Sequence, residues 1–156
     1  MTERDYPAPV SELLTLGDCR GQREWMDYRA LGFGPEHVPD LIRMALDEEL
    51  YWADSEDDAV WAPIHAWRAL AQLHAEEAAQ PLTRLLHRID EYGDDWVGEE
   101  LPRVFGHLGP AAIPVLAGYL ADQTHGLWAR VAAAHGLSEI GKRHPEARSA
   151  AIAALT

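Results

Sequence analysis

Cysteine and basic residues are scarce in this sequence, and each shortage excludes a class of protein. The single cysteine, Cys19, leaves no disulfide pair within the chain, and the N-terminal segment MTERDYPAPV has no apolar stretch of a secretion signal. We therefore expect a cytoplasmic protein. Lys and Arg total 13 against 26 Asp and Glu, which gives a net charge of −13. Nucleic acid and anionic membranes are poor partners for such a surface.

Long apolar runs are also missing. No stretch approaches the roughly 18 residues that span a bilayer, so the sequence predicts no membrane segment. The acidic surface is explained most simply by solubility, and attraction of a basic partner is the alternative. With 156 residues, of which 47% are apolar, the chain is long enough to bury the core of one domain.

Signatures of catalysis and of metal binding are absent from the sequence too. None of the four serines lies in a Gly-x-Ser-x-Gly turn, and no glycine-rich phosphate loop is present. Cys19 falls in the turn-like stretch 17–21, where a structural thiol is more typical than a nucleophile. The eight histidines form no i, i+4 pair of metal-ligand type. The sequence thus predicts no catalytic residue, no metal site and no cofactor.

What the chain has instead is an internal repeat. Three segments begin at Trp61, Trp96 and Trp128, offset by 35 and then 32 residues. Apolar residues follow nine and twelve positions after each tryptophan, a spacing that marks one face of a helix and predicts three B helices. Ahead of each, an amphipathic segment with a proline in its first turn predicts an A helix. The apolar residues are Leu70 and Leu73, Phe105 and Leu108, and Leu137 and Ile140, and the prolines are Pro39, Pro81 and Pro114.

The repeat divides the chain into segments and predicts the fold. Residues 1–34 form a degenerate N-terminal cap, helix pairs occupy 35–74, 75–109 and 110–144, and residues 145–156 begin a further, incomplete pair. No segment has a β-strand pattern. The predicted fold is all-α: an α-α superhelix, in which three to four helix pairs form a short solenoid as a single domain, 1–156. Pro63 and Pro102 predict that two of the B helices begin late or bend.

The third helix pair carries a resemblance to a known family. Its pattern AAIPVLAGYL followed by WARVAAAHGLSEIG resembles the HEAT-like repeat of phycobilisome-lyase-related proteins. The stretch YRALGFGPEHVPDLIRMALDEE is similar to the opening of bacterial proteins of this class, so the resemblance covers residues 28–156. It implies an α-solenoid with a scaffolding or binding role, although the class also contains enzymes. HEAT-like proteins that bind iron use His-Glu dipeptides on successive helices, and this sequence has none.

The repeat also indicates a candidate binding surface. If the apolar residues point inward, positions four, seven and eleven after each tryptophan point away from the core and line the inner curve of the stack. Position seven is basic in all three repeats, on an otherwise acidic chain. The alternative is that these residues pair with neighbouring carboxylates and are merely solvated. The candidate binding residues are His65, Arg68, Gln72, Glu100, Arg103, His107, His135 and Glu139.

The ends of the B helices provide two further expectations. Tryptophan is common among binding hot spots, but a column of large rings more often packs between repeats, and we expect Trp61, Trp96 and Trp128 to be at least partly buried. Asp57 or Asp58 precedes the first B helix, and Asp94 precedes the second. We expect these aspartates to cap the helices, because a carboxylate accepts hydrogen bonds from the free N–H groups there.

The function predicted is a non-catalytic protein-binding or structural scaffold module whose inner curve binds a protein or peptide. The alternative is an accessory enzyme domain or lyase-like chaperone that holds a small molecule or tetrapyrrole in the same groove. A deep apolar pocket would favour the alternative, and a shallow polar groove the binding module. Residues 145–156 are rich in small apolar residues, so we expect a longer solenoid to cover them or, as the alternative, an end-to-end homodimer.

Overall fold

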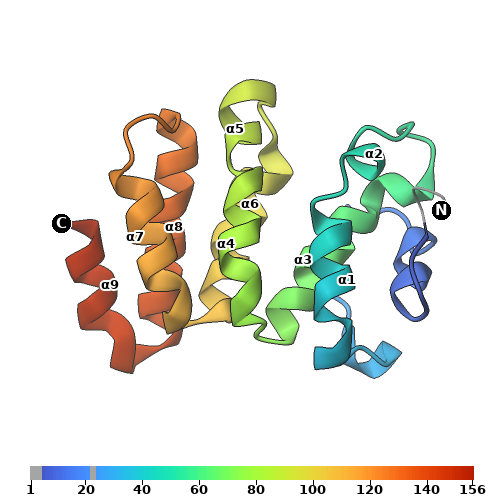
Figure 1. The fold of residues 1–156 in the computed structure, drawn as a ribbon, viewed down its shortest axis with the longest axis horizontal. Coiled ribbons are helices and arrows are strands. Elements are labelled where there is room, and N and C mark those ends of the chain that lie inside the picture. The colour runs from blue at the N-terminus through green and yellow to red at the C-terminus, as the bar shows by residue number, and fades with distance from the viewer. Residues whose placement is uncertain (1–4, 22–23) are drawn as a thin grey trace. The chain divides into compact units, whose positions relative to one another are not determined.

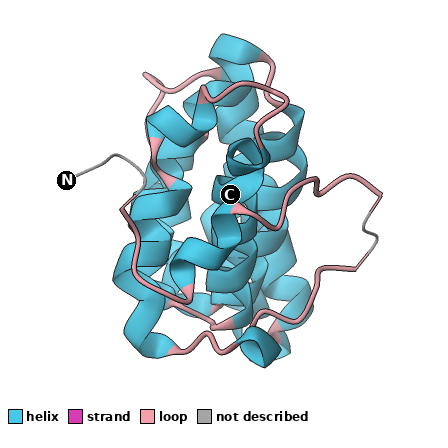
Figure 2. Cartoon of the chain, turned by 90° about the vertical axis from the view of Figure 1, so that its right-hand side faces the viewer, coloured by secondary structure: helices cyan, strands magenta, loops and turns pink. Residues whose placement is uncertain are grey.

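The computed structural model describes residues 5–21 and 24–156. Helices account for 72% of this part of the chain, and it contains no strand (Figure 1, Figure 2). The all-α prediction is therefore confirmed. Contacts between residues fall into two compact units, Met1–Leu73 and His74–Thr156, which we call unit 1 and unit 2.

Unit 1 is built around one buried helix. Its α-helices are α1 (Val38–Ala45), α2 (Glu48–Tyr51) and α3 (Ala62–Gln72), and its 3-10 helices are η1 (Val10–Leu14), η2 (Arg29–Leu31), η3 (Pro35–His37) and η4 (Asp58–Trp61). Among the described helices of unit 1, α1 and α3 make the most extensive contact with each other (Figure 1). Every residue of α3 except Gln72 is buried. The first B helix is therefore covered on all sides, and not on one face only.

The N-terminal segment covers α3 in a different way from the predicted cap. Residues 1–4 and 22–23 of that cap lie outside the described residues. In its described residues, 5–21 and 24–34, the helical elements are the 3-10 helices η1 and η2, and no α-helix is present. Val10 and Leu13 of η1 are buried, and Tyr6 donates a hydrogen bond of 2.6 Å to Asp47 at the start of α2. Apolar stretches this short anchor the segment, but an α-helix of so few residues is marginal on its own.

Unit 2 is built around α8 (Leu127–Arg143). The α-helices before it are α4 (Ala79–Leu82), α5 (His87–Tyr92), α6 (Asp95–Leu108) and α7 (Ile113–Ala121), and α9 (Arg148–Leu155) follows it. Unit 2 also has four described 3-10 helices. They are η5 (Glu76–Ala78) before α4, η6 (Thr83–Leu85) between α4 and α5, η7 (Pro110–Ala112) before α7 and η8 (Pro145–Ala147) before α9. The central helix α8 packs against α6, α7 and α9 and also contacts α5 (Figure 1).

Two glycines allow α6 and α8 to approach each other closely. A Cβ atom at Gly106 of α6 would lie 2.8 Å from Cβ of Glu139 on α8. A Cβ atom at Gly136 of α8 would lie 3.3 Å from Cβ of Phe105 on α6. Carbon atoms in favourable contact are about 3.5–4.0 Å apart. Alanine at either glycine would therefore push the two helices apart.

The helices predicted from the repeat are present, and all of the predicted buried positions except the half-buried Leu73 are buried. The predicted B helices are α3, α6 and α8, and the predicted A helices are α1, the α4–α5 segment and α7. Leu70, Phe105 and Leu137, which share one position in the repeat, are all fully buried. The periodicity of the apolar residues thus identifies the core of the B helices correctly.

The three tryptophans of the repeat have different environments. Trp61 and Trp96 are half-buried, as expected. Trp128 is 59% exposed, so the predicted burial of this side chain is wrong. The reason is local, because Ala129 is the residue in the first turn of α8 that faces inward. Trp128 points to another side of the helix.

The two prolines of the B helices also differ. Pro63 lies in the first turn of α3 and η4 precedes it, so that helix begins after Trp61, as predicted. Pro102 lies inside α6, which extends from Asp95 to Leu108, so this helix does not begin late, and a bend at Pro102 stays a prediction. Pro102 has no N–H for the carbonyl of Gly98. The remaining hydrogen bonds and the burial of α6 are enough to continue the helix past this point.

The B helices begin in three different ways. Asp94 accepts a hydrogen bond from Val97 N at 3.1 Å and caps α6, which confirms that predicted cap. Asp57 accepts one from Ala59 N at 2.9 Å but caps η4, the 3-10 helix before α3, and α3 itself has no side-chain cap. The residue before α8 is Gly126, which has no side chain to serve as a cap. Instead, the carboxylate of Asp90 on α5 accepts hydrogen bonds from two N–H groups of the first turn of α8, Trp128 N (3.1 Å) and Ala129 N (2.8 Å).

Candidate functional site

The eight predicted binding residues divide between the two units. Unit 1 contains His65, Arg68 and Gln72, all on α3. Unit 2 contains the other five: Glu100, Arg103 and His107 on α6, and His135 and Glu139 on α8. The two groups have different environments, and only the second borders open space.

The prediction for unit 1 is wrong, because its residues face the interior. His65 and Arg68 are 0% and 1% exposed. The half-buried Gln72 accepts a hydrogen bond from Tyr28 N (2.9 Å) and donates one to the Met26 carbonyl (2.8 Å). These polar residues hold the N-terminal segment against α3. The periodicity argument assumed one buried face, whereas Gly17, Cys19, Met26 and Tyr28 contact a second face of this helix.

His65 is at the centre of a buried hydrogen-bond network. Its Nε2 lies 2.8 Å from the carbonyl of Gly17, and its Nδ1 lies 2.7 Å from the hydroxyl of Tyr28. A carbonyl can only accept, so Nε2 carries the proton and Nδ1 accepts from the Tyr28 O–H. Sγ of the buried Cys19 is 3.4 Å from the same Nε2. A protonated Nε2 cannot take the proton of the thiol, which supports the interpretation of Cys19 as structural.

In unit 2 the predicted residues border a groove between α6 and α8 of about 520 Å³, which we call the α6–α8 groove. Arg103, His135 and Glu139 line it, whereas Glu100 and His107 are half-buried beside it. Lys142 was missed by sequence reasoning, although its spacing of seven from His135 places both on one face of α8. The full lining is Gly98, Glu99, Pro102, Arg103, His135, Ser138, Glu139 and Lys142.

The charge of this groove differs from that of the whole chain. Arg103 and Lys142 provide its positive charges, and Glu99 and Glu139 provide its carboxylates. Nε of Arg143 lies 3.5 Å from Oε2 of Glu139 and partly neutralises it. With two cations and two carboxylates in its lining, the groove has no net charge, on a chain whose net charge is −13. Over distances longer than about 8 Å, salt screens the remaining acidic surface, so these local charges determine which ligand groups bind there.

Basic side chains surround the C-terminal end of α6. Nδ1 of His74 donates to the carbonyl of His107 (2.8 Å), and Nε2 of His144 donates to the carbonyl of Gly106 (3.1 Å). These bonds satisfy carbonyls that have no partner within the last turn of a helix. Burial, followed by the charge of Arg143, lowers the pKa of His107 to about 4. His107 is therefore neutral at pH 7 and adds no charge to the groove.

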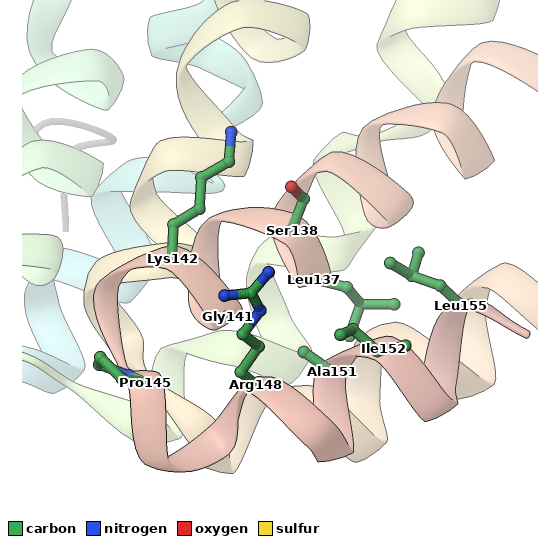
Figure 3. A pocket seen from close by; sticks show the side chains of 9 residues that line it. All are labelled: Leu137, Ser138, Gly141, Lys142, Pro145, Arg148, Ala151, Ile152 and Leu155. Atoms are coloured by element: carbon green, nitrogen blue, oxygen red, sulfur yellow. The ribbon is translucent and has the colours of Figure 1, made fainter.

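A second groove, of about 440 Å³, lies between α8 and α9 (Figure 3), and we call it the α8–α9 groove. Ser138 and Lys142 line both grooves. Ile152 and Leu155 are 51% and 42% exposed, so this groove is an open apolar surface and not an enclosed pocket. Its lining consists of Leu137, Ser138, Gly141, Lys142, Pro145, Arg148, Ala151, Ile152 and Leu155.

Metal-ion sites and membrane-spanning helices are two further features to consider in the described residues. Residues 5–21 and 24–156 contain no group of three or more His, Cys, Asp or Glu that could hold a metal ion. Within the same ranges, no single helix has the length and hydrophobicity to cross a membrane. Only α6 together with Pro110–Ala121 meets those criteria, as a pair bent by 117°.

Comparison with known proteins provides no assignment: no family model matches the chain, and neither does any curated protein or solved structure. The HEAT-like resemblance therefore stays a prediction that depends on the repeat in the sequence. The functional assignment depends on the geometry and charge of the two grooves of unit 2.

Proposed function

We propose that this chain is a non-catalytic protein-binding module of the HEAT-like class, in which the α6–α8 groove binds a segment of a partner protein. The observation that carries the proposal is the lining of that groove. Arg103 and His135 occupy position seven of successive repeats, and they lie around one open space together with Glu139 and Lys142. We include in the proposal a cytoplasmic location and a stack of helix pairs that forms a short solenoid.

The chemistry of the α6–α8 groove fits a peptide better than a small apolar ligand. Charged side chains around an open groove provide specificity and steer a partner of complementary charge. A tetrapyrrole or other flat apolar molecule needs an enclosed, mostly apolar pocket. The α6–α8 groove is charged and the α8–α9 groove is open, so neither has that character.

The proposal is tested by charge reversal within the groove. We expect R103E/K142E to bind the partner at least about tenfold more weakly, because both cations are removed from the contact surface. The matched control is R29E/R84E, which makes the same change in charge at exposed positions outside the groove. Arg68 is unsuitable for this test, since it is buried.

The measurement has two steps. Immobilised wild-type chain captures partners from an extract of the source organism, and each captured protein is then purified and titrated against the wild type and both variants by calorimetry. A specific partner binds the wild type and R29E/R84E alike and loses affinity for R103E/K142E. A partner that binds all three proteins equally would place the site elsewhere and refute the proposal.

A further inference from the structure

One face of α9 in unit 2 presents large apolar side chains to solvent. Ala151 is buried, whereas Ile152 and Leu155 are 51% and 42% exposed. Figure 3 shows these two side chains beside Leu137 of α8, at one end of the α8–α9 groove. Single exposed apolar residues are ordinary on a protein surface, but two that share a groove with a third provide a continuous apolar contact.

The other end of the groove is basic. Lys142 and Arg148 lie toward Pro145, away from Ile152 and Leu155 (Figure 3). Both cationic side chains are exposed. None of the described residues that line this groove is a carboxylate. An apolar surface is thus joined to a cationic end that has no counter-charge in the lining.

From this combination we infer that the α8–α9 groove docks an acidic amphipathic helix of a partner protein. The apolar face of that helix packs on Leu137, Ile152 and Leu155, which is the usual helix-in-groove mode of recognition. An Asp or Glu of the same helix lies between Lys142 and Arg148. The inference goes beyond the proposed function, because it concerns a different groove and a different kind of contact.

The spacing of the residues defines the pattern of the docked helix. A helix rises about 1.5 Å per residue, so Arg148 and Leu155, seven residues apart on α9, are separated by about 10 Å, or two turns. The partner helix therefore carries its acidic residue about two turns away from apolar residues spaced by three or four.

A second copy of this chain fits the groove less well than an acidic partner. In a two-fold dimer the same surface meets itself. Because the lining of this groove contains no carboxylate, the surface of a second copy offers Lys142 and Arg148 no counter-charge. An acidic helix supplies that counter-charge.

The test uses the full chain and a synthetic peptide. The probe is a fluorescein-labelled helical peptide of about 18 residues, with leucines spaced by three and four and two glutamates two turns away. One control peptide has the same composition in scrambled order, and a second has lysine in place of each glutamate. We expect fluorescence anisotropy to show that the probe binds at least about tenfold more tightly than either control.

Variants then locate the contact. I152S/L155S removes the apolar end and should weaken binding about tenfold, and R148E should weaken it about fivefold. A153S changes an exposed residue of α9 that does not line the groove and should have no effect, and the same holds for R84E at an exposed position outside both grooves. Equal binding of the scrambled peptide, no binding of the probe, or an unaffected R148E would each overturn the inference. So would light scattering that shows a dimer dissociated by I152S/L155S, because a second copy would then be the occupant.

Discussion

At the scale of single residues, polar side chains of unit 1 hold the N-terminal segment in place, which the spacing of the apolar residues does not predict. His65 and Arg68 occupy positions that looked exposed, yet both are buried. The His65 ring connects the Gly17 carbonyl with the Tyr28 hydroxyl, and the guanidinium carbon of Arg68 lies 5.5 Å from the centre of the Trp25 ring. A buried polar group is stable only when it has such partners, so each contact fixes part of the N-terminal segment.

The Tyr28 hydroxyl should therefore contribute measurably to stability. We expect Y28F to lower the free energy of unfolding by about 1–3 kcal/mol, because Nδ1 of His65 stays buried and loses its hydrogen-bond donor. Urea denaturation followed by circular dichroism measures the change. Y92F removes a hydroxyl from an exposed tyrosine and serves as the control. Equal stability of the two variants would contradict the His65 network.

His107 predicts a dependence of stability on pH. Its folded pKa, about 4, lies below the ordinary value of 6.5, so the unfolded chain binds the proton more tightly. The stabilisation is therefore complete above about pH 6.5 and is lost as the pH falls toward 4. Because the ring is only half-buried, solvent screening reduces the expected loss between pH 7 and pH 5 to about 1 kcal/mol. Urea titrations at both pH values should show a smaller loss in H107Q, and an equal loss would refute the assignment.

At the scale of elements, α8 depends on contacts from its neighbours. Asp90 of α5 supplies its N-terminal cap, and Gly106 of α6 and Gly136 of α8 allow close packing of the two helices. Gly126 is part of the same arrangement, since a Cβ atom there would lie 2.5 Å from Oδ2 of Asp90. Gly126 therefore leaves room for the carboxylate that caps α8.

This arrangement predicts non-additive effects of two substitutions. D90A should cost about 1 kcal/mol, the usual value of a cap. G126A should also destabilise, because its methyl group collides with the Asp90 carboxylate. In D90A/G126A the carboxylate is absent and the methyl group meets nothing. The double variant should therefore lose less stability than the sum of the two single losses, by at least about 0.5 kcal/mol. Strict additivity in urea denaturation would show that the methyl group and the carboxylate do not meet.

The sequence predicted the positions of the helices more accurately than it predicted which side chains are exposed. Spacing of the apolar residues located α3, α6 and α8 and their buried residues Leu70, Phe105 and Leu137, since burial of one helix face is a local property of the pattern. The spacing did not predict that His65 is buried. The segment that covers the second face of α3 lies far from it in the sequence, and His65 contacts Gly17 across more than 35 residues. The α6–α8 groove was identified in part, through Arg103, His135 and Glu139. The α8–α9 groove was not predicted, because the packing angle of two helices is not encoded in their periodicity.

At the scale of the whole molecule, charge is the dominant property. The net charge of −13 is spread over both units, and the cations that line the two grooves are exceptions to it. Self-repulsion of this size destabilises the compact state and is weakened by salt. The fold is therefore expected to be sensitive to ionic strength even though surface ion pairs contribute little individually.

We expect the melting temperature to rise by about 2–4 °C between roughly 0.01 M and 0.1 M sodium chloride, over which the screening length falls from about 30 Å to about 10 Å. Differential scanning calorimetry measures the shift. The control E12Q/E48Q/E76Q/E77Q removes four negative charges from exposed positions and should show a smaller rise. A melting temperature that falls with salt would mean that favourable ion pairs outweigh the self-repulsion.

Lys142 lies where the two grooves meet, on the helix they share. It has a single ammonium group, so a carboxylate that binds it in one groove withdraws it from the other. If both grooves bind acidic segments, occupancy of either one lowers the affinity of the other, and thermodynamic reciprocity makes the two penalties equal. A module of this kind would exclude one partner when it holds the other, and a single lysine side chain would set the strength of that competition.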